Sequence, residues 1–171
     1  MTDRGTATGQ NTKQMSIFDK IKKTVQTAIN ESAVECFFVR EMMLTLIGMR
    51  GEWVYQFDGN TEELRRCRVV YSGEEDELLL EASIFCSKQT MLDLFSACEI
   101  HRWNGFHGAH PRHVQDGIMF RFEAAVNGGQ TICADGSANY PRGYHDFVRT
   151  MDEMLAEHDM TEASNRKNQN H

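Results

Sequence analysis

The sequence lacks the long apolar run that a membrane-spanning helix needs. No segment approaches the ~18 to 20 apolar residues required to cross a bilayer, and residues 1–15 are polar, without the apolar stretch of a signal peptide. The five cysteines are odd in number and have no CxxC spacing, so they indicate neither a disulfide framework nor a four-thiolate zinc site. These absences predict a protein of the reducing cytoplasm that is neither exported nor membrane-spanning.

The signatures of common catalytic sites are also missing. The chain has no P-loop, no GxGxxG, no GxSxG elbow and no HExxH, and no HxE is followed by PCxxC. Cys98 falls in register with the apolar stripe of a predicted helix, which indicates a buried, inert thiol rather than a nucleophile. These features favour a protein that is not an enzyme.

Basic residues are fewer than acidic residues. Lys and Arg number 18 against 25 Asp and Glu, which gives a formal net charge of −7 at pH 7. The resulting field repels phosphate backbones and anionic lipid headgroups, so we expect neither a nucleic-acid partner nor a membrane partner. Hydrophobic residues make up 40% and charged residues 25%. This is ordinary globular usage, and it predicts one core that forms without disulfides.

The two ends of the chain are polar and lack apolar periodicity. We therefore predict a flexible leader over residues 1–15, a single domain over 16–158 and a flexible polar tail over 159–171.

Apolar periodicity predicts three helices and a set of strands within that domain. The helices are expected over 16–32, after Ser87 and after Gly143. The stretch 34–47 fits strand or helix on periodicity alone and is interpreted as a strand. The other expected strands lie at 53–57, 67–71, 78–85, 119–125 and 132–134. The prediction is an α+β fold, a mostly antiparallel sheet of about five to six strands with three helices packed on one side.

The densest cluster of unusual residues lies in the segment 101–117. Long segments without regular structure inside a compact domain are commonly functional. Trp103 and Phe106 are interpreted first as anchors that fold the loop onto the sheet, and alternatively as an aromatic wall for a ligand. Arg102 and Arg112 would then serve an anionic group. The predicted ligand- or partner-binding residues are Arg102, Trp103, Asn104, Phe106, Arg112, Asp116, Ser137 and Asn139.

Three histidines of this segment form a candidate metal site. His107, His110 and His113 are spaced by three residues, and imidazoles so placed could converge on zinc or another transition metal. Such a spacing suits one turn of a helix, however, and the glycine and proline between them disfavour a helix. We therefore expect no cofactor, with zinc kept as the alternative.

The second half of the chain resembles a group of small, uncharacterised bacterial proteins. The similarity covers about residues 78–157 and has the form W-x-G-F, then D-G-x-x-F, then G-S-x-N-[YF]-P. The resemblance brings no activity with it. It implies that several residues shape the loops at one end of the sheet, namely Trp103, Gly105, Asp116, Gly117, Gly136 and Pro141.

The leading hypothesis is a non-enzymatic binding or regulatory protein of a bacterium or mobile element. It would recognise a partner protein or a small ligand through the 103–116 loop. The alternative is a metal-dependent hydrolase that uses the histidine cluster. A third hypothesis is a homo-oligomer in which an edge strand such as 53–57 pairs across a two-fold axis.

Overall fold

The computed structural model describes residues 36–73 and 76–168, with side chains as far as residue 156. The predicted leader over 1–15 and the predicted helix over 16–32 lie outside these residues. The elements run in the order β1 (Val39–Gly48), β2 (Gly51–Asp58), β3 (Glu63–Tyr71), β4 (Asp76–Phe85), α2 (Lys88–Ala97), the short 3-10 helix η1 (Ile100–Arg102), β5 (Phe106–Gly108), β6 (Met119–Val126), β7 (Gln130–Ser137) and α3 (Tyr144–Asn168).

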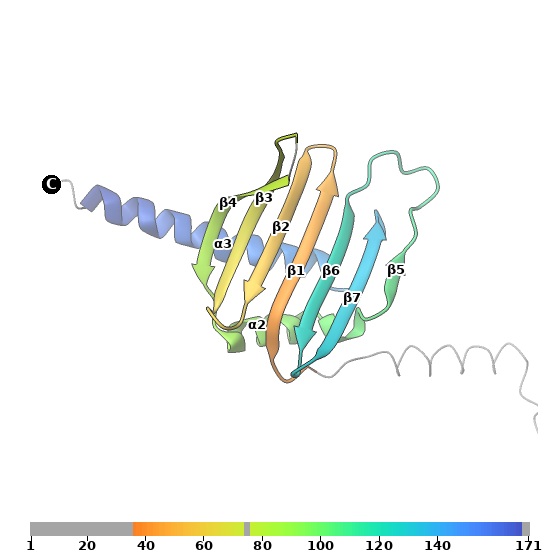
Figure 1. The fold of residues 1–171 in the computed structure, drawn as a ribbon, viewed down its shortest axis with the longest axis horizontal. Helices are drawn as coiled ribbons and strands as arrows, with labels where there is room; N and C mark the ends of the chain where they lie inside the picture. Colours follow the sequence, from red (N-terminus) through yellow and green to blue (C-terminus); the bar gives the residue numbers. More distant parts are fainter. Residues whose placement is uncertain (1–35, 74–75, 169–171) are drawn as a thin grey trace, which may run out of the picture. The chain divides into compact units, whose positions relative to one another are not determined.

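The strands form one seven-stranded open sheet in the order β4-β3-β2-β1-β6-β7-β5 (Figure 1). Every neighbouring pair is antiparallel except β5 and β7, which are parallel. The predicted α+β class and the mostly antiparallel sheet are therefore confirmed. The strand number differs from the prediction because residues 106–108, expected to be irregular, form β5.

Both helices pack on the same face of the sheet, where they meet the aromatic side chain of Phe122 on β6. Phe95 of α2 lies 6.1 Å from Phe122 between ring centroids, and Phe147 of α3 lies 6.0 Å from it. In Figure 1 the two helices lie behind the strands. Apolar residues that alternate along β1 and β6 point into this layer, and Met42 and Leu44 are buried there. We call the other face of the sheet the open face, because neither described helix covers it.

A partly buried polar contact fixes α3 against the sheet. The Tyr55 hydroxyl donates to Asp152 Oδ1 at 2.7 Å, and Arg66 Nη1 donates to the same oxygen at 2.9 Å. Burial, followed by the hydrogen bond to Asp152, raises the pKa of Tyr55 above its ordinary range. Arg66 also pairs with Glu81 Oε2 at 3.2 Å, so this network joins β2, β3, β4 and α3.

One expectation about the position of a strand in the sheet is corrected. Residues 53–57 lie in β2, which is paired on both sides with β1 and β3, so the prediction of an edge strand there is wrong. The helix α3 runs to Asn168, past the predicted domain boundary at residue 158. No helix in the described part of the chain has both the length and the apolar character needed to cross a membrane.

Candidate functional site

Trp103, the most conspicuous residue of the predicted loop site, belongs to the core. Its side chain is 1% exposed and meets Phe122 and Phe147 edge-on, with ring centroids 5.1 and 5.6 Å away. The indole Nε1–H donates to the backbone oxygen of Arg142 at 2.9 Å, which satisfies its one polar group. These contacts favour the anchoring interpretation over the aromatic wall.

The residues after Trp103 attach this segment to strand β7. The Asn104 Oδ1 atom accepts from the Cys133 N–H at 3.2 Å, and the Gly105 N–H donates to the Cys133 oxygen at 2.8 Å. Phe106 is partly buried against the core and begins the parallel pairing of β5 with β7. Asn104 and Phe106 therefore hold the sheet edge together.

His110 fastens the 109–117 segment at two points. Its Nε2 lies 2.7 Å from the Val114 carbonyl oxygen, which can only accept, so Nε2 carries the proton and donates. In the neutral ring Nδ1 is then an acceptor, and it lies 2.8 Å from Ser137 Oγ. This is a serine–histidine pair of the kind that activates a nucleophile.

The groups that would have to stabilise an oxyanion next to Ser137 already have partners. The Ala138 N–H donates to the Ile118 oxygen at 3.1 Å. Asn139 Nδ2 donates to the Ala109 oxygen at 3.3 Å. Acyl transfer needs unoccupied donors aimed at the developing charge, so the pair is best explained as a clamp between two loops.

The three predicted metal ligands do not converge. His107 Nδ1 lies 2.5 Å from Asp135 Oδ1, and His110 is engaged in the clamp. His113 is exposed and has a backbone φ of 78°. Within residues 36–73 and 76–156, no three His, Cys, Asp or Glu side chains lie close enough together to hold a metal ion. The geometry gives the zinc hypothesis no support.

The charged residues predicted for the loop are spread over its surface. Arg102 is exposed, with Nη1 at 3.5 Å from Glu99 Oε1. Arg112 and Asp116 are exposed. Asp116 borders a hollow of about 460 Å³ whose other lining residues are chiefly apolar, namely Leu46, Gly48, Met49, Arg50, Trp53, Gly117 and Ile118.

The described thiols are poorly suited to nucleophilic chemistry. Cys98 is 5% exposed, and burial, followed by the charge of Asp146, raises its pKa. Burial likewise raises the pKa of Cys86 to about 11. Because the thiolate is the reactive form, the interpretation of Cys98 as an inert core residue agrees with its surroundings.

The hydrogen bonds of His110 lead to a stability prediction. We expect His110→Ala to lower the free energy of unfolding by about 1 kcal/mol, because both clamp contacts are lost at a largely exposed site. Amide hydrogen exchange should accelerate in residues 109–117. The matched variant His101→Ala removes no hydrogen bond that the structure shows in its described part. Equal exchange in the two variants would contradict the clamp.

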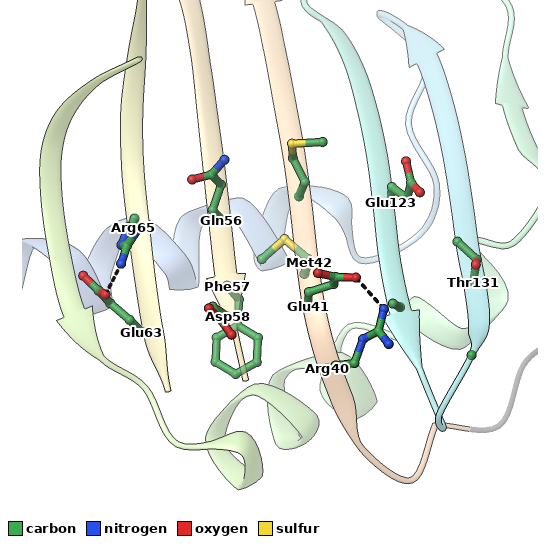
Figure 2. Close-up of a pocket in the computed structure, with 13 residues that line it drawn as sticks. Arg40, Glu41, Met42, Gln56, Phe57, Asp58, Glu63, Arg65, Glu123 and Thr131 are labelled. Atoms are coloured by element: carbon green, nitrogen blue, oxygen red, sulfur yellow. Dashed lines mark hydrogen bonds and ion pairs between the residues drawn. The ribbon is translucent and has the colours of Figure 1, made fainter. Parts of the chain in front are cut away.

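A hollow of about 510 Å³ on the open face was not anticipated from the sequence (Figure 2). It spans β1, β2, β3, β6 and β7, and its polar side chains stand in front of the strands. Its lining includes four carboxylates, from Glu41, Asp58, Glu63 and Glu123, and two guanidinium groups, from Arg40 and Arg65. The hollow therefore has an excess of negative charge.

Both arginines of the hollow already form ion pairs with neighbouring glutamates. Arg40 Nη2 lies 2.8 Å from Glu41 Oε1, and Arg65 pairs with Glu63. Asp58 Oδ1 accepts a single backbone N–H, from Asn60 at 2.8 Å. Glu123 stands exposed on β6, opposite Met43 of β1. Asp58 and Glu123 are thus the carboxylates best placed to receive a cation from outside.

The open face becomes apolar toward the β1–β2 turn. The strand register sets Ile47 opposite Met119, and Leu80 opposite Cys67. Leu78 and Leu80 are more than half exposed. We call this part of the open face the apolar half; its members are Thr45, Ile47, Val54, Cys67, Val69, Leu78, Leu80 and Met119. Val54 and Cys67 are buried, and the charged Glu52 and Arg121 lie on the same face beside Ile47 and Thr45. In the sequence, the run Leu78-Leu79-Leu80 could have indicated this apolar surface, because it breaks the apolar–polar alternation of an ordinary surface strand.

No protein-family model, no curated protein and no solved structure matches the chain. The functional argument therefore rests on the sheet itself and on the side chains of its open face.

Proposed function

We propose that this protein is a non-catalytic binding protein that recognises a partner protein on the open face of its sheet. The observation that carries the proposal is the composition of that face, where an apolar half adjoins an acidic hollow. In this proposal the predicted loop site has a structural role. Trp103 packs in the core and His110 links two loops at one end of the sheet, which stabilises the strands that form the open face.

The apolar half supports binding because its composition departs from that of a solvated sheet face. Antiparallel sheets covered on one side alternate apolar and polar residues, with the polar ones facing water. Here the outward positions of β4 and the end of β1 carry Leu78, Leu80 and Ile47, all exposed. Contiguous exposed apolar surface with a polar rim is typical of protein interaction sites.

The acidic hollow supports a partner that brings positive charge. Asp58 and Glu123 have carboxylate oxygens available for lysine or arginine, whereas Arg40 and Arg65 are already paired. Charge complementarity of this kind contributes mainly to specificity and association rate, and apolar contacts contribute most of the affinity. We infer a partner segment whose apolar side chains cover the apolar half and whose basic side chains enter the hollow.

A charge reversal in the hollow tests the proposal. A library of random displayed peptides selected on the wild-type protein should be enriched in sequences that combine basic and apolar residues. For a selected peptide, Glu123→Lys should raise the dissociation constant by about tenfold or more, as measured by calorimetry. The matched variant Glu153→Lys makes the same change on α3, on the other side of the sheet, and should leave binding unchanged.

Chemical-shift mapping of the same peptide distinguishes the open face from the loop. The proposal expects perturbed amides on β1, β2 and β6. If the perturbed amides cluster instead in residues 101–117, the loop predicted from sequence is the recognition site and the open face is not.

A further inference from the structure

The two edges of the sheet differ greatly in length. The edge strand β5 has three residues, and the edge strand β4 has ten. An edge strand presents a row of unpaired backbone N–H and C=O groups to any other strand that approaches. Natural proteins usually protect long edges with charged side chains, prolines or a covering element.

In β4 such protection flanks an apolar centre: Asp76, Glu77 and Glu81 are charged and a β-bulge lies at Glu81, but the three residues between them are leucines. Leu78, Leu79 and Leu80 are 52%, 57% and 54% exposed. Leu79 lies opposite Arg68, on the helix side of the sheet, and its two neighbours lie on the open face. Apolar surface is therefore exposed on both sides of this edge.

We propose that β4 pairs antiparallel with β4 of a second copy of this chain, about a two-fold axis at Leu79. An isologous contact must be self-complementary, and the sequence around Leu79 meets this condition. Leu78 of each copy falls opposite Leu80 of the partner subunit on the open face. The two Leu79 side chains meet on the helix side. The two sheets then join into one.

The flanking charges set the strength of this contact. Pairing about Leu79 brings Glu77 opposite Glu81 of the partner subunit, and like charges directly opposite one another are destabilising. Glu81 is already paired with Arg66, which reduces this repulsion without removing it. The contact is therefore expected to be reversible and to strengthen if one of the two charges is inverted.

The helix layer also extends past this edge. In Figure 1, α3 passes behind β4 and continues beyond it, and its backbone is helical as far as Asn168. A second β4 placed beside the first would therefore lie next to a helix that already reaches beyond the edge. This arrangement continues the two-layer packing of helix on sheet across the two-fold axis.

Light scattering and sedimentation equilibrium of the full chain test the proposal. The mass of the wild-type protein should rise from one chain to two as concentration increases. Leu79→Lys should weaken the association by at least about tenfold, because it places two lysines against each other at the axis. Met49→Lys introduces the same group at an exposed apolar position on the β1–β2 turn and should leave the association unchanged.

A second variant covers the case in which Leu79→Lys fails to fold. Glu77→Lys should tighten the association, because lysine then faces Glu81 of the partner subunit. A wild-type protein that stays monomeric throughout overturns the proposal. So does a Glu77→Lys variant that associates no more tightly than wild type, or equal effects of Leu79→Lys and Met49→Lys. Glu77 and Leu79 both lie on the helix side of the sheet, so neither variant alters a side chain of the open face.

Discussion

Trp103→Ala is expected to lower the free energy of unfolding by about 3 to 5 kcal/mol, the range for deleting a large aromatic side chain from a core. The indole is almost fully buried and meets rings from both the sheet and α3. Its loss leaves a cavity between these two layers. It also leaves the Arg142 carbonyl without its donor. Urea unfolding followed by circular dichroism measures the change.

Trp103→Phe separates the two contributions. Phenylalanine keeps most of the apolar contact but has no N–H, so the loss should be smaller, at about 1 to 3 kcal/mol. If Trp103→Ala instead left stability unchanged while abolishing peptide binding, the indole would be a ligand contact and its assignment to the core would be wrong.

The second large effect is expected at Gly143, just before α3. Its φ is +81°, and a Cβ placed there would lie 2.2 Å from the Cys98 carbonyl oxygen. Gly143→Ala therefore combines backbone strain with a clash against the backbone that follows α2. We expect a loss of roughly 3 to 5 kcal/mol, measured by the same denaturation.

Gly105 provides the matched control for this prediction. It has a similar φ of +77°, but nothing lies within 4 Å of a Cβ built on it. Gly105→Ala should therefore cost only the left-handed backbone penalty, about 1 to 2 kcal/mol. Similar losses in the two variants would mean that close packing at Gly143 adds nothing.

The strands could be predicted from the sequence because their signals are local. Alternation predicted β2 to β4 and the β6–β7 hairpin, whereas 34–47 fitted strand or helix and was interpreted as a strand. The apolar stripe after Ser87 predicted α2, whose N-cap is Ser87. The strand β5 was missed because three residues are too few for a periodic signal. Its pairing of Phe106 with Ala134 joins parallel segments that are distant in sequence.

The candidate site was harder to predict, because it depends on which face of the sheet remains uncovered. Alternation shows that Met42 and Met43 point to opposite faces, but it does not say which face the helices occupy. The three-residue spacing of the histidines suggested that His107 and His110 bind the same metal ion. Each ring instead found its own partner on β7, Asp135 and Ser137, and no local pattern specifies such contacts.

The position of β1 in the middle of the sheet has a consequence for synthesis. The pairs β1–β2, β2–β3 and β3–β4 join neighbouring segments, whereas β1 also pairs with β6, as between Val39 and Val126. A nascent chain can therefore form the four-stranded meander long before β6 leaves the ribosome. Until then the two edge strands of the meander, β1 and β4, can pair with strands of other chains. Slow translation between β4 and β6 should therefore increase aggregation, and a chaperone that shields β1 should reduce it.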